Sequence, residues 1–134
     1  MNAEAKLTGL AHIGIFTADL EKSVAFYESL GFHKDAQCKP GPTLAFLSLG
    51  TCLLELICPE DKSSLAARNP DGWIGHVCIE CRHIDEVVAS YKERGIIPKE
   101  AQVSYSAEIL GGIKNIFFDG PSGESIELFD YLKD

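Results

Sequence analysis

The chain has 134 residues, of which 46% are hydrophobic and 24% are charged. These fractions are ordinary for one globular domain, so they exclude intrinsic disorder and a fibrous repeat. The net charge of −8, with no basic run, makes nucleic acid and anionic membranes poor partners. The longest apolar stretch, residues 43–58, is shorter than the ~18–20 residues of a membrane span, and no secretory signal is visible. We therefore expect a cytoplasmic protein whose partner is a small molecule.

The first half of the chain predicts one strand, one helix and a run of strands. A strand at residues 9–16 precedes a helix that begins after Asp19, a good N-cap, and ends at Gly31, where a left-handed C-cap is expected. An extended segment leads to two strands, residues 43–49 and 51–58, joined by a tight turn at Gly50. The polar connection that follows predicts a short helix at residues 63–68.

The second half predicts the same order of elements. A strand from residue 73 leads to a helix with Arg82 and His83 in its cap region and Gly95 at its end. Strands at residues 114–119 and 124–131 then flank a turn that contains glycine and proline.

An internal repeat relates the two halves. Residues 9–32 align without a gap with residues 73–96, and residues 44–57 align with residues 116–129, which places Phe46 on Phe118. We therefore predict an α+β fold made of two tandem βαβββ modules that form a curved mixed sheet around a metal-binding concavity. The modules span about residues 7–58 and 73–132 of a single domain, residues 1–134.

The same alignment matches two histidines and two glutamates, because His12 falls on His76 and Glu55 falls on Glu127. Strand alternation places all four on one face of the sheet, while the opposite face is branched aliphatic, as at Val77, and suits packing against the helices. A pseudo-twofold between the modules would bring the four side chains together.

Two buried carboxylates without a partner would cost several kcal/mol each, and a divalent cation removes that cost. Two nitrogen and two oxygen donors suit Ni²⁺, Zn²⁺, Co²⁺, Mn²⁺ or Fe²⁺. The alternative is that each histidine is a hydrogen-bonded core residue and each glutamate lies on an exposed edge. The recurrence of all four residues in register favours the metal.

Five cysteines are an odd number in a chain large enough to fold without disulfides, so we expect reduced thiols. Cys78 and Cys81 have the C-x-x-C spacing of some redox and zinc sites. On a strand, however, residues three apart point to opposite faces, and we interpret both as small buried side chains.

The chain resembles the vicinal oxygen chelate superfamily, which includes glyoxalase I, methylmalonyl-CoA epimerase, extradiol dioxygenases, and the fosfomycin-resistance and bleomycin-binding proteins. The matching pieces are LAHIGIFTADLEKSVAFYESLGF, LLELICP, GHVCIEC with its helix, and FDGPSGESIELFD, which cover about residues 7–132. The resemblance implies paired βαβββ modules with a metal ligand on the first and last strand of each. In this chain those ligands are His12, Glu55, His76 and Glu127.

By the same resemblance, the His-Glu-His-Glu set favours a bacterial-type glyoxalase I, because epimerases of the family usually carry Gln at the position of Glu55. The expected function is a metal-dependent lyase or isomerase that acts through an enediolate on a 2-oxoaldehyde-derived or other carbonyl substrate. The metal would polarise the carbonyl, and Glu127 would move the proton, with Glu55 as its counterpart and Glu80 as a further acid or base. The alternatives are an extradiol-type dioxygenase and a non-redox binding or resistance protein.

Two positions depart from the glutathione-binding pattern of glyoxalase I. Where the family carries an Arg four residues after the first ligand, this chain has Phe16, and where it carries an Asn four residues after the Glu ligand, this chain has Pro59. A substrate less anionic than a glutathione conjugate is therefore supported as well as the glutathione conjugate itself. We expect apolar walls for its pocket, and we expect a homodimer. The wall residues would be Phe16, Leu53, Trp73 and Phe129.

Overall fold

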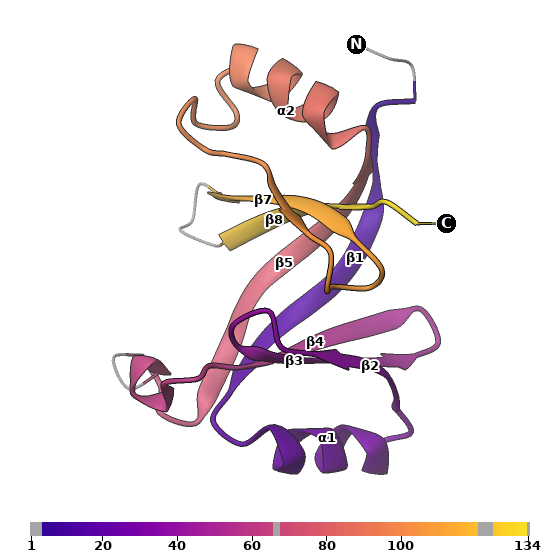
Figure 1. Cartoon of the computed structure of the whole chain (residues 1–134), viewed down its shortest axis with the longest axis vertical. Helices are drawn as coiled ribbons and strands as arrows, with labels where there is room; N and C mark the ends of the chain where they lie inside the picture. Colours follow the sequence, from indigo (N-terminus) through magenta and orange to yellow (C-terminus); the bar gives the residue numbers. More distant parts are fainter. Residues whose placement is uncertain (1–3, 66–67, 121–124, 134) are drawn as a thin grey trace. The chain divides into compact units, whose positions relative to one another are not determined.

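The computed structural model describes residues 4–65, 68–120 and 125–133. Two strand–helix–strand–strand–strand series follow one another along the chain (Figure 1). The first comprises β1 (Lys6–Thr17), α1 (Leu20–Ser29), β2 (His33–Cys38), β3 (Thr43–Leu49) and β4 (Cys52–Cys58). The second comprises β5 (Gly72–Arg82), α2 (Ile84–Glu93), β6 (Ser104–Ser106), β7 (Ile113–Asp119) and β8 (Ser125–Tyr131). The two βαβββ modules and the α+β class are thereby confirmed.

The strands form one mixed sheet in the order β2-β3-β4-β1-β5-β8-β7-β6. In each module the first strand pairs in parallel with the last, whereas the hairpin strands are antiparallel. The connection between the modules contains a short 3-10 helix at Lys62–Leu65. The helix predicted at residues 63–68 thus begins one residue earlier and is a 3-10 helix, and residues 66–67 lie outside the described residues.

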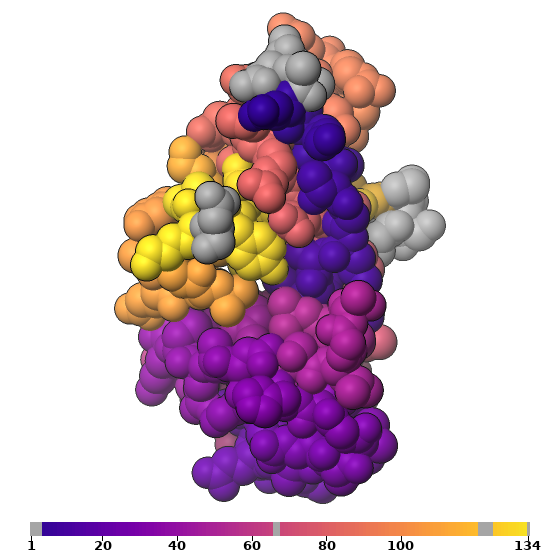
Figure 2. Space-filling model, turned by 90° about the vertical axis from the view of Figure 1, so that its right-hand side faces the viewer, coloured from indigo at the N-terminus to yellow at the C-terminus, as the bar shows by residue number. Residues whose placement is uncertain are grey.

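The chain divides into two compact units, and their boundaries differ from the boundary between the two modules. One unit is residues 12–76, and the other combines residues 1–11 with residues 77–134. The long strands β1 and β5 each contribute to both units. Figure 2 shows the indigo N-terminal strand beside the salmon-coloured segment of β5 and α2, and the Thr8 hydroxyl donates to the Glu80 carbonyl oxygen at 3.2 Å.

Strand register confirms the repeat at the parallel pairs. Ile13 pairs with Leu54 in the first module, and their repeat partners Val77 and Ile126 pair in the second. Gly14 likewise pairs with Glu55, as Cys78 pairs with Glu127. The first and last strands of the two modules therefore pair in equivalent registers, as the sequence alignment predicts.

The hairpin of the second module departs from the predicted alignment by one residue. Phe46 lies opposite Glu55, but Phe117 lies opposite Glu127, so matching Phe46 to Phe118 is wrong. The turns differ in length, because Leu49 pairs with Cys52 whereas Asp119 pairs with Ser125. A shift of one residue moves a side chain to the other face of a sheet. The residues of the second turn, 121–124, lie outside the described residues.

Part of the aliphatic face packs against the helices. In residues 12–76, Ala45, Leu47 and Leu56 pack with side chains of α1. In the other unit, the core of α2 contains Cys81, Ile84, Val87, Val88, Ile116 and Leu128. Val77 was expected on this covered face, but its side chain is 42% exposed.

The helix starts are capped in two different ways. The Asp19 carboxylate accepts from the Lys22 N–H at 3.1 Å, as predicted. His83 occupies the second N-cap position, but its side chain makes no capping hydrogen bond. Asp130 of β8 instead accepts from the Ile84 N–H at 3.1 Å. Both helices are followed by the expected glycines with positive φ, 106° at Gly31 and 74° at Gly95.

No helix within the described residues is long and apolar enough to cross a membrane. The five cysteines, all of them described, are in no disulfide. Cys78 and Cys81 are both buried. Burial, reinforced by Asp130 and Glu80, raises the pKa of the Cys81 thiol to about 12. A thiol with so high a pKa stays protonated and therefore unreactive at neutral pH.

Thiol labelling should separate the cysteines by burial. We expect exposed Cys52 to react with iodoacetamide at pH 8 in the native protein, and we expect Cys78 and Cys81 to react only after denaturation. Peptide mass spectrometry after timed labelling measures this. A disulfide between Cys78 and Cys81 after mild oxidation would contradict their interpretation as buried side chains.

Candidate metal centre

Three of the four predicted ligands lie on three adjacent strands within residues 12–76. His12 comes from β1, Glu55 from β4 and His76 from β5. Each is less than 9% exposed, and His12 is fully buried. Parallel pairing of β1 with β4 places Gly14 beside Glu55, so His12 and Glu55 are near neighbours on one face.

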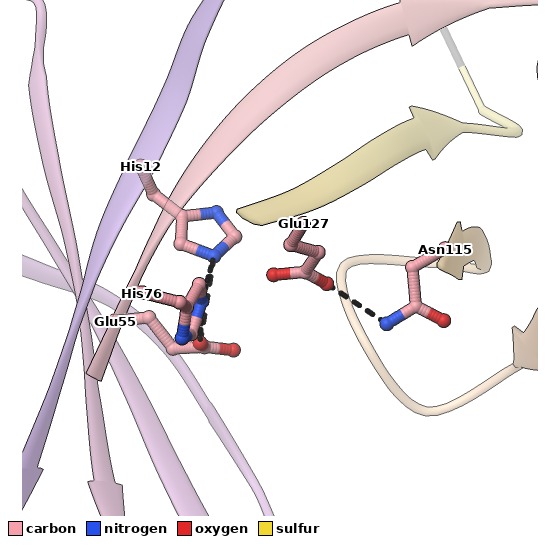
Figure 3. A network of polar contacts seen from close by, with 5 residues as sticks. All are labelled: His12, Glu55, His76, Asn115 and Glu127. Atoms are coloured by element: carbon pink, nitrogen blue, oxygen red, sulfur yellow. Dashed lines mark hydrogen bonds and ion pairs between the residues drawn. The ribbon is translucent and has the colours of Figure 1, made fainter. Parts of the chain in front are cut away.

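The ligand atoms of these residues converge (Figure 3). The Nε2 atoms of His12 and His76 are 3.2 Å apart. The Oε1 atom of Glu55 lies 3.4 Å from the first of these nitrogens and 3.3 Å from the second. The three atoms thus form a nearly equilateral triangle. We name these three residues the His-Glu-His triangle.

A cation fits this triangle better than hydrogen bonding does. Each Nε2 of a neutral or protonated imidazole carries at most one proton, so protons can lie along no more than two of the three short distances. Ligands that bind one ion at ~2.0–2.2 Å lie ~2.8–3.1 Å from their neighbours in octahedral geometry and ~3.3–3.6 Å in tetrahedral geometry. The measured separations fall within the span of these two geometries. The donor set, two imidazole nitrogens and a carboxylate oxygen, is also one that divalent transition metals accept.

Gly14 makes room for His76. A β-carbon at position 14 would lie 2.0 Å from Cε1 and 2.4 Å from Nδ1 of the His76 ring. Any larger residue would therefore force the imidazole out of its place, or move β1 away from it. The repeat gave no sign of this requirement, because the equivalent of Gly14 in the second module is Cys78.

Glu127 lies in the other unit, on β8, and is 3% exposed. Its Oε2 accepts from the Asn115 Nδ2 at 2.8 Å, a contact across β7 and β8 (Figure 3). Asn115 fixes the direction of the carboxylate and was not identified from sequence. The alignment of the two halves could not indicate it, because the aligned part of the second hairpin begins at residue 116. On β7 this alignment is also displaced by one residue from the structural register.

Two of the predicted pocket residues pack against each other. The rings of Phe16 and Trp73 have centroids 4.9 Å apart, and the Arg68 guanidinium lies 5.3 Å from the Trp73 ring. Gly75 allows this packing, since a β-carbon there would lie 2.3 Å from the Phe16 ring. Phe16 also lines a pocket of about 440 Å³ within residues 12–76.

The remaining predicted residues lie elsewhere. Leu53, two residues before Glu55 on β4, does not line that pocket. Phe129 is 1% exposed in the other unit, where its ring packs against Tyr131 with centroids 4.9 Å apart. Glu80 is half-buried on β5. The catalytic and pocket roles of these residues stay predictions.

Replacing Gly14 should disable the metal centre without removing a ligand. We expect Gly14→Ala to weaken Co²⁺ or Ni²⁺ binding at least tenfold, because the new methyl group occupies the place of the His76 ring. Gly41→Ala is a matched control, since nothing lies within 4 Å of a β-carbon at that position. Calorimetric titration measures the affinity, and unchanged affinity in Gly14→Ala would contradict the role of His76 as a ligand.

Sequence comparison finds relatives along most of the chain. A model of the Glyoxalase/Bleomycin resistance protein/Dioxygenase superfamily matches residues 11–117. The mitochondrial methylmalonyl-CoA epimerase of Homo sapiens is 30% identical over 106 residues, which cover 73% of this chain and 60% of that protein. The Bos taurus enzyme of the same name is 32% identical over 104 residues, covering 70% and 59%. The chain thus matches about 60% of the length of these relatives.

Solved structures share the fold. The methylmalonyl-CoA epimerase of Mycobacterium tuberculosis superposes with a TM-score of 0.73 at 22% identity, over 97% of this chain and 92% of that one. BphC, a halotolerant catechol dioxygenase, superposes with a TM-score of 0.60 at 18% identity, over 92% and 40%. The family match over residues 11–117, with the human relative at 30% identity over 73% of the chain, shows that the chain belongs to the glyoxalase/bleomycin resistance/dioxygenase superfamily.

Proposed function

We propose that this protein is a metal-dependent isomerase that moves a proton at the carbon next to a carbonyl group. The observation that carries the proposal is the buried His-Glu-His triangle, whose three ligand atoms are 3.2–3.4 Å apart. From the sequence repeat, which matches Glu127 to Glu55, we take Glu127 as the fourth ligand and as the base. The similarity to methylmalonyl-CoA epimerases supports an isomerase among the activities of the superfamily.

The chain's own residues define the chemistry. His12, His76 and Glu55 hold the ion, which when bound supplies Lewis-acid polarisation of the substrate carbonyl. Glu127 is the carboxylate that removes the proton from the adjacent carbon and returns it. Asn115 donates to Glu127 Oε2 and so helps to orient that carboxylate. Delivery of a proton to the opposite face of the same carbon, with Glu55 as the acid on that face, gives an epimerase. Return of the proton by Glu127 to the neighbouring carbon gives an isomerase of the glyoxalase type.

The proposed chemistry is compatible with two substrate classes, and the identity of residue 55 bears on the choice between them. Epimerase relatives favour a 2-branched acyl thioester such as methylmalonyl-CoA, the substrate in their names. The glyoxalase I-like lyase is the second candidate. It is favoured by Glu55, a position at which family epimerases usually carry Gln, as the resemblance implies. We also propose a homodimer, as expected from the family resemblance; its test is the mass in solution by light scattering.

Exchange of the substrate proton with solvent tests the isomerase directly. In D₂O, the metal-loaded protein should introduce deuterium at the acidic carbon of a 2-methyl-branched acyl thioester or of a 2-oxoaldehyde hemithioacetal, without consuming oxygen. Mass spectrometry of the recovered compound and an oxygen electrode measure the two quantities. Oxygen uptake with a catechol would instead support the dioxygenase alternative and would contradict the isomerase.

The base can be separated from the metal ligands by substitution. Glu127→Gln keeps the size and a neutral oxygen ligand but removes the basic carboxylate. We expect it to retain most of the bound metal and to lose exchange activity about 10²–10⁴-fold, the usual contribution of general acid–base catalysis. Elemental analysis and the exchange assay report the two effects. Full activity in this variant would assign the base to another residue.

The contact between Asn115 and Glu127 predicts a smaller effect. Asn115→Leu has a similar size but no donor, so Glu127 should lose its fixed direction, and we expect kcat to fall about tenfold at unchanged KM. The melting temperature should also fall, because the buried Glu127 carboxylate loses a hydrogen bond. Gln102→Leu is the matched control, since Gln102 is an exposed amide in the same unit that donates only to the Glu100 carbonyl at 3.4 Å. Equal behaviour of the two variants would exclude a positioning role for Asn115.

A further inference from the structure

The pocket beside Phe16 has apolar walls. Phe16, Pro42, Ile57 and Pro59 contribute to its lining, and its volume is about 440 Å³. Ile57 is 7% exposed. The Phe16 ring is held between Trp73, with centroids 4.9 Å apart, and the bare backbone of Gly75. The Phe16 ring is therefore packed on two sides, and the apolar wall suits an apolar group of a bound molecule.

The rim of the same pocket is acidic. Glu60 and Asp61 line it, together with Ser64. The Asp61 Oδ1 accepts from the Ser63 hydroxyl at 2.6 Å and from the Ser63 N–H at 3.0 Å. These hydrogen bonds lower the pKa of the Asp61 carboxyl, so it stays negatively charged at neutral pH. A carboxylate or phosphate entering here would meet like charge.

The pocket begins next to the His-Glu-His triangle. Phe16 and Ile57 are paired in register across β1 and β4, two residues beyond the pair formed by Gly14 and Glu55. Residues two apart on a strand point to the same face and lie about 7 Å apart. A molecule whose chelating end binds a metal at the triangle can therefore reach the pocket with a tail of a few carbon atoms.

From this geometry we propose that the pocket between Phe16, Ile57 and Pro59 is a specificity site that accepts an apolar, uncharged substituent of the substrate and rejects an anionic one. This inference rests on the proposed function, because it takes the triangle as the place where the carbonyl end of the substrate binds. It narrows the substrate class to carbonyl compounds with an apolar side chain.

A series of hydroxamates tests the proposal by binding alone. The hydroxamate group chelates the metal, and the tail reports on the pocket. The compounds are acetohydroxamate, 4-phenylbutanohydroxamate, and the same chain ending in a carboxylate instead of phenyl, each titrated calorimetrically into the Co²⁺-loaded protein. Because a buried phenyl group contributes about tenfold or more in affinity, the phenyl tail should bind at least tenfold tighter than acetohydroxamate. The carboxylate tail should bind no tighter than acetohydroxamate.

Two variants assign the selectivity to the pocket. Glu60→Gln with Asp61→Asn removes the rim charge at the surface, and should raise affinity for the carboxylate tail at least threefold without changing the phenyl tail. Glu21→Gln with Glu28→Gln, on α1, is the control with equal change in charge and should alter neither. Phe16→Arg should reverse the preference, and circular dichroism confirms that it folds.

The outcomes distinguish this proposal from the function on which it rests. If acetohydroxamate fails to bind the metal-loaded protein, both the metal-centred function and the pocket proposal are wrong. If acetohydroxamate binds but the three compounds have equal affinity, or the carboxylate tail binds most tightly, the pocket proposal is overturned and the isomerase stands.

Discussion

The structure of the site depends on one constraint: two imidazole nitrogens and a carboxylate oxygen meet in a buried space, all about 3.3 Å apart. Burial of a carboxylate costs several kcal/mol unless a charge or hydrogen bonds compensate it. The protons of two imidazoles cannot lie along all three short distances. A divalent ion bound by all three atoms meets both requirements, and the surrounding strands hold the ligands in place.

Strand pairing explains how the chain creates this arrangement. A parallel pair within the first module places His12 and Glu55 on one face, and β5 supplies His76. The close approach of His76 to β1 is possible only because position 14 is a glycine. Gly75 has the same effect, because the absence of a β-carbon there leaves space for the Phe16 ring. The two glycines thus make space for the rings of His76 and Phe16.

The sequence predicted those features that repeat. The sequence matches His12 with His76 and Glu55 with Glu127 because two copies of a strand pattern agree in register. The structure pairs those strands as the alignment does. Features without a copy were missed. Asn115 has no matched partner in the first module. The match of Phe46 with Phe118 failed because the two hairpin turns differ in length. Such a difference shifts the strand register, but the hydrophobic pattern of the sequence does not reveal it. The Asp130 cap was missed because it depends on a contact between elements distant in sequence.

The central proposal is that His12, His76 and Glu55, together with Glu127 as the sequence repeat predicts, bind one metal ion. A crystal structure of the Co²⁺-loaded protein, with anomalous data at the cobalt edge, measures this most directly. The account predicts one strong anomalous peak per chain within about 2.2 Å of both Nε2 atoms and of an oxygen from each glutamate. An absent peak under metal excess, or a peak bound by other residues while the His-Glu-His triangle stays as it is, would contradict it.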